Sequence, residues 1–146
     1  MSKKGFVGIF LALLFLSSCD FTPRIHKEIL DAQDSLSQQN FGEAVKKYSK
    51  ILKNGPDDKI KVKIHYQLGE IYSLHLGEYQ KAIEHFQSVQ DLTEEPIWQV
   101  KSEERIAQIS YEFLKNYDLS IKSYKRLSSS TPPLKTYDKY EYRIPM

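Results

Sequence analysis

The stretch YQKAIEHFQSV, residues 79–89, decides the fold because its apolar residues follow a helical period. At this spacing, one face of an α-helix carries a stripe in which small residues alternate with large ones. The stripe is Tyr79, Ala82, Ile83, Phe86 and Val89. The same pattern recurs 38 residues earlier, at Phe41, Ala44, Val45, Tyr48 and Ile51, and 38 residues later, at Tyr117, Ser120, Ile121, Tyr124 and Leu127. The sequence therefore predicts three equivalent amphipathic helices.

Another helical stretch precedes each stripe. These stretches carry apolar residues at helical spacing: Ile25, Ile29, Ala32 and Leu36; Ile64, Leu68, Ile71 and Tyr72; and Trp98, Ile106, Ile109, Phe113 and Leu114. Turn signals lie within the pairs, at 39–40, 76–78 and 115–116, and helix breakers end the pairs, at 54–56, 94–96 and 131–133. No segment shows the sustained alternation of a strand. We expect an all-α chain of three helix-turn-helix units, at about 25–58, 58–96 and 96–134, stacked side by side.

The second unit resembles the tetratricopeptide repeat, through Leu68-Gly69, Tyr72, Gly77, Tyr79, Ala82, Phe86 and Val89. The third unit keeps Ala107, Tyr111, Tyr117, Ser120, Tyr124, Leu127 and Pro132, and the first keeps Ala32, Phe41, Ala44, Tyr48, Ile51 and Pro56. The chain departs from the usual pattern at Asp31 and Ser35, where apolar or aromatic residues are common, and in its period, which is 38 residues instead of about 34. The resemblance covers roughly residues 25–134. It implies an α-α superhelix, or solenoid, whose first helices line a concave protein-binding groove.

The positions of the first helices that face such a groove give the candidate partner-binding residues. They are His26, Gln33, Tyr66, Glu70, Ser73, Arg105, Glu112 and Phe113. Ile29 and Ile109 map to the same face, but they and Phe113 are equally expected to pack between helices. The mixture of apolar and charged residues favours a protein partner that offers a peptide or helix with apolar anchors. Trp98 is expected near the start of a helix, as a buried anchor or as an exposed contact.

The N-terminus has the pattern of an export signal. Lys3-Lys4 is followed by an apolar run from Gly5 to Leu16 and then by Ser17-Ser18-Cys19. A basic start, a short apolar core and small residues before a cleavage site are typical of a signal peptide. The run is shorter than the ~20 apolar residues that span a bilayer. We therefore expect residues 1–18 to be a removable signal peptide.

Leu16-Ser17-Ser18-Cys19 resembles the lipobox of bacterial lipoproteins. This resemblance implies that lipid is attached to Cys19 and that the chain is cleaved just before it. Two or three acyl chains would then hold the chain stably at a membrane. Residues 19–24 would form a short lipidated linker, which places the folded domain close to the bacterial cell envelope, facing the periplasm or the exterior. Asp20 resembles an inner-membrane retention signal, but this rule varies between lineages, so either membrane remains open.

The composition excludes several function classes. The net charge of +2 comes from Lys3 and Lys4, so the chain after residue 18 is near neutral and lacks the basic face that nucleic-acid binding needs. One cysteine allows neither an intramolecular disulfide nor a thiol cluster for zinc. No phosphate-binding loop, nucleophile elbow or metalloprotease motif is present. We expect no enzyme activity, no cofactor, no metal site and no small-molecule substrate.

Two further sets of polar residues have structural interpretations. His65, His75 and His85 are ten residues apart but fall on at least two helices, so we expect them to face solvent or to be partly packed. The acidic pairs at 94–95 and 103–104 are expected at helix N-termini or in solvent, because adjacent carboxylates on a helix point apart.

The last unit of a solenoid needs a cover for its exposed apolar face. Leu134, Tyr137, Tyr140 and Ile144 could form a short capping helix opened by Pro132, or the tail at 135–146 could bind a partner. The sequence thus predicts a lipid-anchored envelope adaptor that binds protein partners through a groove. The alternative is a structural subunit of an envelope complex, or a homo-oligomer, that uses its convex face or its tail.

Overall fold

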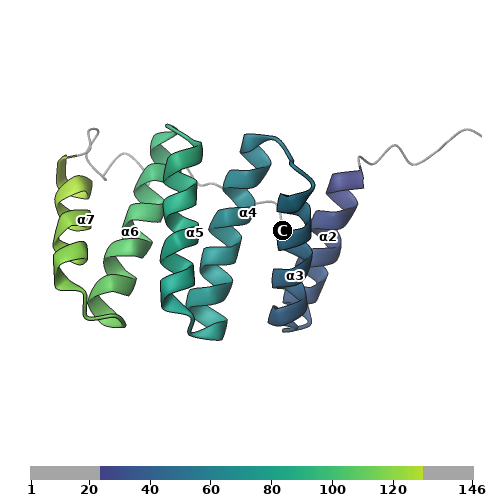
Figure 1. The fold of residues 1–146 in the computed structure, drawn as a ribbon, viewed down its shortest axis with the longest axis horizontal. Helices are drawn as coiled ribbons and strands as arrows, with labels where there is room; N and C mark the ends of the chain where they lie inside the picture. Colours follow the sequence, from purple (N-terminus) through teal and green to yellow (C-terminus); the bar gives the residue numbers. More distant parts are fainter. Residues whose placement is uncertain (1–23, 130–146) are drawn as a thin grey trace, which may run out of the picture.

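The computed structural model describes residues 24–129. The predicted signal peptide, the lipid-attachment residue Cys19 and the tail at 135–146 lie outside these residues. Within them the chain forms six α-helices, a short π-helical turn and no strand (Figure 1). The elements are α2 (Arg24–Ser37), α3 (Phe41–Lys53), α4 (Asp58–Ile71), η2 (Tyr72–Leu76), α5 (Tyr79–Leu92), α6 (Pro96–Glu112) and α7 (Tyr117–Ser129).

The helices form three hairpins, α2 with α3, α4 with α5, and α6 with α7. Figure 1 shows the helices alongside one another in chain order, with α2 and α3 at one end and α7 at the other. Successive hairpins are joined because α3 packs on α4 and α5 packs on α6. The predicted all-α stack of helix-turn-helix units is therefore confirmed.

Local signals in the sequence explain where the helices begin and turn. The side chains of Asn40 and Asp57 accept hydrogen bonds from backbone N–H groups at the starts of α3 and α4, which satisfies donors that have no partner within the helix. Pro96 opens α6, where its missing N–H costs nothing. Gly77 takes a left-handed conformation, with φ at 66°, in the turn between α4 and α5.

The extra length of the second and third units lies at the ends of their first helices. In the second unit, α4 continues into η2, a wider turn that accommodates an additional residue before Gly77. In the third unit, the backbone N–H of Leu114 donates to the carbonyl of Ile109, five residues back, which is the same kind of widening. Each such turn adds about one residue. The rest of the difference between 38 and about 34 lies in the greater length of these first helices, 58–76 and 96–112 against 24–37.

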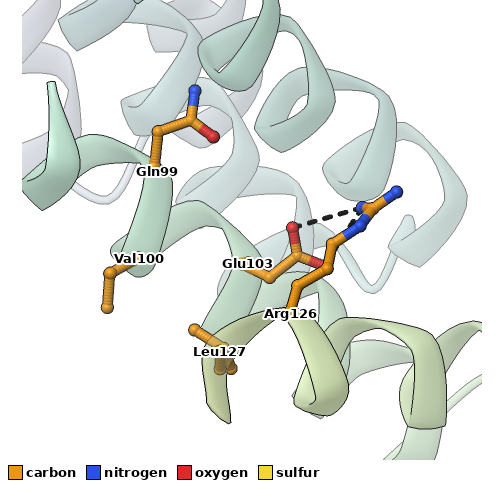
Figure 2. Close-up of a pocket in the computed structure, with 5 residues that line it drawn as sticks. All are labelled: Gln99, Val100, Glu103, Arg126 and Leu127. Atoms are coloured by element: carbon orange, nitrogen blue, oxygen red, sulfur yellow. Dashed lines mark hydrogen bonds and ion pairs between the residues drawn. The ribbon is translucent and has the colours of Figure 1, made fainter. Parts of the chain in front are cut away.

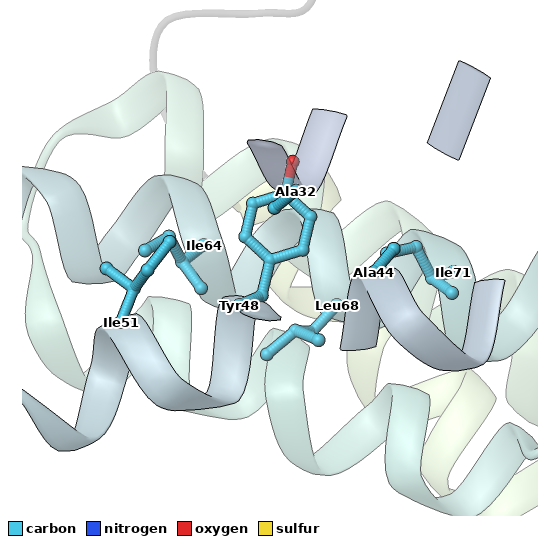
Figure 3. Close-up of a cluster of buried hydrophobic side chains, with 7 residues drawn as sticks. All are labelled: Ala32, Ala44, Tyr48, Ile51, Ile64, Leu68 and Ile71. Atoms are coloured by element: carbon cyan, nitrogen blue, oxygen red, sulfur yellow. The ribbon is translucent and has the colours of Figure 1, made fainter. Parts of the chain in front are cut away.

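Two apolar clusters form the core. The first joins α2, α3 and α4 through Ala32, Ala44, Tyr48, Ile51, Ile64, Leu68 and Ile71 (Figure 3). The second joins α5 and α6 through Ala82, Ile83, Phe86, Ile106 and Ile109. In both, the stripe of a second helix meets the first helix of the next hairpin. The predicted stripes of the first two units are therefore the surfaces that hold the stack together.

The third stripe differs from the other two. Ser120 and Leu127 are buried, but Tyr117, Ile121 and Tyr124 are each about half exposed, at 51–52%. Such an apolar face was expected on the last unit, and the residues expected to cover it, Leu134, Tyr137, Tyr140 and Ile144, lie outside the described residues. The face is exposed because, among residues 24–129, no further hairpin follows α7 to cover it.

In the first unit, Asp31 and Ser35 depart from the usual repeat pattern, and hydrogen bonds from Lys47 explain both departures. Ser35 is buried, and its hydroxyl donates to the carbonyl of Asp31. Lys47, on α3, donates to that same carbonyl at 2.9 Å and to the hydroxyl of Ser35 at 2.8 Å. A hydrogen-bonded contact thus joins α2 to α3 where an aromatic side chain is usual, so the polar residues do not leave unsatisfied groups in the interface.

Candidate functional site

The first helices of the second and third hairpins meet in a polar network around Arg105. Its Nε donates to Glu70 Oε1 at 2.7 Å, and one terminal nitrogen lies 3.4 Å from the hydroxyl of Ser73. Arg105 comes from α6, whereas Glu70 and Ser73 come from α4 and η2. The side chains of Arg105 and Glu70 are 21% and 24% exposed, so the pair lies at the surface and is reachable from solvent. Three of the predicted partner-binding residues are therefore brought together.

The network continues along α6. The other terminal nitrogen of Arg105 donates to Gln108 Oε1 at 2.8 Å, and Gln108 Nε2 donates to both carboxylate oxygens of Glu112 at 3.3 Å. Gln108 was missed by the sequence analysis. The helical spacing of three and four residues to Arg105 and Glu112 was the signal that could have identified it. The result is a continuous line of donors and acceptors from Glu70 to Glu112.

Aromatic rings lie beside this network. The ring of Tyr66 packs edge-on against Phe86 and against Trp98, with centroids 5.4 Å apart in each case. Burial raises the pKa of Tyr66 to about 12, and the nearby carboxylate of Glu70 adds to the shift. Trp98 is half-buried, and the ammonium group of Lys101 lies 5.7 Å from its ring centroid. Trp98 thus packs on Tyr66 with intermediate burial, between the two expected roles.

The other predicted residues are distributed along the row of hairpins. Phe113 is half exposed and stacks on Tyr79 of the preceding hairpin, with centroids 4.2 Å apart. Ile109 is buried in the second core cluster, so it packs between helices and is not available to a partner. His26 and Gln33 are exposed on α2, one hairpin away from the network around Arg105. We call Tyr66, Glu70, Ser73, Arg105, Gln108 and Glu112 the α4–α6 surface.

Two histidines form an unexpected contact within the second hairpin. The Nδ1 atoms of His65 on α4 and His85 on α5 are 2.9 Å apart, so one ring donates to the other. The ring of Tyr72 stacks on His85 with centroids 5.4 Å apart. Burial lowers the pKa of His85 to about 4, with His65 as a second cause, and burial and the charge of Lys61 lower the pKa of His65. The prediction that the histidines are partly packed fits this arrangement, but their pairing was not predicted.

A small cavity lies between α6 and α7. Gln99, Val100, Glu103, Arg126 and Leu127 line its volume of about 110 Å³ (Figure 2). Glu103 was expected at a helix N-terminus or in solvent, but it is buried within α6, where it accepts hydrogen bonds from Gln90 on α5 and from Arg126 on α7. The expectation was wrong because α7 places a guanidinium above this carboxylate. Ligand pockets are several times larger, at ~300–1,000 Å³. The ion pair between Glu103 and Arg126 beside the cavity joins α6 to α7.

Two other features bear on what the described residues can do. Across 24–129, no three histidine, cysteine, aspartate or glutamate side chains gather in a way that could hold a metal ion. In the same range, no helix combines the length and the apolar content needed to cross a bilayer.

Comparison with known proteins finds a similarity to one repeat family at the centre of the chain. Residues 62–96 match the family model of the tetratricopeptide repeat. The match begins in α4, covers η2 and α5, and ends at the first residue of α6. No curated protein and no solved structure matches the chain. Together, the hairpin stack and this match define the chain as an all-α, tetratricopeptide-like helical solenoid, a class of scaffold that generally mediates protein–protein interactions.

Proposed function

We propose that the chain is a lipid-anchored adaptor of the bacterial cell envelope, and that it binds a protein partner through the α4–α6 surface. The observation that carries the proposal is the polar network that converges from two hairpins on Arg105. Its members hold one another in place, and the charged side chains of Arg105 and Glu70 remain partly exposed beside the buried Ser73, so a partner meets a preorganised set of donors and acceptors. Tyr66 and Phe113 flank it with aromatic surface, which suits a peptide or helix that has apolar anchors.

The anchoring part of the proposal rests on the sequence. The apolar run to Leu16 and the Ser17-Ser18-Cys19 sequence after it favour export and acylation at Cys19. Partner binding would then take place at a membrane surface that faces the periplasm or the exterior, with a role in the assembly or maintenance of an envelope complex. The proposed adaptor has no catalytic role.

Two measurements test the two parts separately. For the surface, the partner is recovered from detergent extracts with the wild-type chain, with Arg105→Ala, with Glu112→Ala and with Lys122→Ala, an exposed position on α7 that serves as the control. We expect Arg105→Ala and Glu112→Ala to reduce recovery at least fivefold and Lys122→Ala to leave it unchanged. Because Arg105 also contacts Glu70, thermal melts establish that each variant is folded. Equal recovery with all four chains would reject the surface.

For the anchor, cells are labelled with radioactive palmitate. The wild-type chain should incorporate label, and Cys19→Ala should lose it and accumulate as an unprocessed or soluble product. Ser18→Ala keeps a small residue before the cleavage site and serves as the control. Labelling of the Cys19→Ala variant would reject lipid attachment at this residue.

A second candidate function is that of a structural subunit. The half-exposed face of α7 favours it, because an uncovered apolar face can join another subunit. Deletion of residues 135–146 tests whether the tail is that interface. A smaller complex with an intact fold would support the structural subunit and make the tail its interface, whereas an unchanged complex would show that the tail is not an interface.

A further inference from the structure

The uncovered face of α7 is equivalent to the faces that α3 and α5 use to hold the next hairpin. Phe41, the first residue of α3, stacks on His75 of the second unit, with centroids 4.0 Å apart and the rings 7° from parallel. Tyr79, the first residue of α5, stacks on Phe113 of the third unit at 4.2 Å and 12°. Both partners in the second contact lie 38 residues after those in the first. Tyr117 is the next residue in this series, and it is 52% exposed.

The aliphatic residues of the two clusters repeat with the same period. Val45 and Leu68 belong to the cluster that joins α3 to α4, and Ile83 and Ile106 belong to the cluster that joins α5 to α6. The second pair again lies 38 residues after the first. Continued once more, the series gives Ile121, which is 52% exposed on α7, and residue 144, which is an isoleucine. The face of α7 is therefore built to receive a helix whose register the sequence supplies.

The chain after α7 has the length that such a helix needs. The connections from a second helix to the next first helix are residues 54–57 and residues 93–95. A connection of the same length after Ser129 covers 130–133 and ends in Pro132-Pro133, where proline suits a helix start. Residues 134–146 then remain, and as a helix they would extend about 20 Å, the length of α7 itself.

We propose that residues 134–146 form the first helix of a fourth, half-built hairpin and pack on the face of α7, with Ile144 against Ile121. Tyr140 falls at the register of Ile64, which is buried in the cluster between the first two hairpins. Asp138 falls at the register of Val62 and Val100, which are buried but belong to neither cluster. Val100 lines a cavity with Leu127, from the second helix of its own hairpin, so this register faces that side of the helix and the carboxylate of Asp138 would not face α7. The chain thereby covers its own last hairpin, and partner binding is left to the α4–α6 surface.

Disulfide cross-linking of the full chain in detergent tests this packing. In a Cys19→Ser background, which removes the only native cysteine, one variant carries Ile121→Cys with Ile144→Cys. The control carries Ile121→Cys with Asp138→Cys, in which the second cysteine lies on another side of the same helix. Under mild oxidation, we expect an intramolecular disulfide that forms at least tenfold faster in the first variant than in the control.

The other occupants of the face give different results. A disulfide-linked dimer in the first variant would assign the face to a second copy of the chain. Equal rates for the two variants, or no disulfide in either, would show that the tail does not pack in this register. Each of these results overturns the proposal, and none of them bears on the α4–α6 surface. As a second measurement, Ile144→Asp should lower the melting temperature and Asp138→Asn should not.

Discussion

A methyl group added at Gly69 tests the close packing inside the second hairpin. A Cβ atom at this position of α4 would lie 2.7 Å from Cζ and 2.8 Å from Cε1 of the Phe86 ring on α5. That ring is fully buried and meets Tyr66 edge-on, so it has little room to move. Gly69→Ala should therefore overpack the helix contact, although alanine is the better helix former.

The two effects have opposite signs and different sizes. Overpacking of a filled core costs about 1–3 kcal/mol, and replacing glycine by alanine within a helix gains about 0.5–1 kcal/mol. We expect Gly69→Ala to lower the free energy of unfolding by roughly 1 kcal/mol, which corresponds to a fall in melting temperature of about 5 °C. Urea denaturation followed by far-ultraviolet circular dichroism measures the change directly.

Two further variants make the test specific. At Gly42, within α3, a Cβ atom meets nothing within 4 Å, so Gly42→Ala should be neutral or stabilising by up to about 1 kcal/mol. Phe86→Leu replaces the ring that blocks a Cβ at Gly69 with a shorter side chain. In this background, Gly69→Ala should lower the free energy of unfolding by about 1 kcal/mol less than it does in the wild type. A Gly69→Ala chain as stable as the wild type would refute the close contact between α4 and α5.

Three other predictions follow from burial and charge. Phe86→Ala should cost about 3–5 kcal/mol in chemical denaturation, because its ring is fully buried. A loss below about 1 kcal/mol would contradict this burial. Ala82→Leu should overpack the same core and cost about 1–3 kcal/mol, and a melt that it leaves unchanged would count against the α5–α6 contact. The pair formed by His65 and His85 predicts lower stability in acid: burial lowers both pKa values in the folded chain, so the unfolded chain binds more protons below pH ~6.5. This contribution should be complete above that pH and be lost as the pH falls toward the folded pKa of His85 of about 4. In the His85→Gln variant, the fall in the free energy of unfolding across this pH range should be smaller by on the order of 1–2 kcal/mol, allowing for partial solvent screening. An unchanged pH profile would argue that the two rings are not buried together.

The repeat could be predicted from the sequence because its strongest signal is periodic. The stripe from Tyr79 to Val89 and its copies 38 residues away identify the second helices, and burial of Phe86 and Tyr48 bears this out. Apolar spacing reports which face of a helix is covered, but it does not report whether a covering helix exists. For this reason the exposure of Tyr124 could not be read from the stripe alone.

The polar contacts were harder to predict because they depend on how separate helices are placed. Arg105 and Glu70 could be assigned to one face from their positions in the repeat, and they form an ion pair. The burial of Glu103 depends instead on Arg126, which comes from α7. The contact between His65 and His85 likewise needs the crossing of α4 and α5, which no spacing within one helix specifies. The widened turn before Gly77 also left no sequence signal beyond the longer period.

Nuclear Overhauser contacts between aromatic rings test most directly that the hairpins are equivalent units. The account predicts strong contacts from Phe41 to His75 and from Tyr79 to Phe113, because each pair stacks within about 4 Å and the two pairs lie 38 residues apart. If either pair shows no contact, or if these rings contact residues in other registers, the hairpins do not repeat and the stacked arrangement is contradicted.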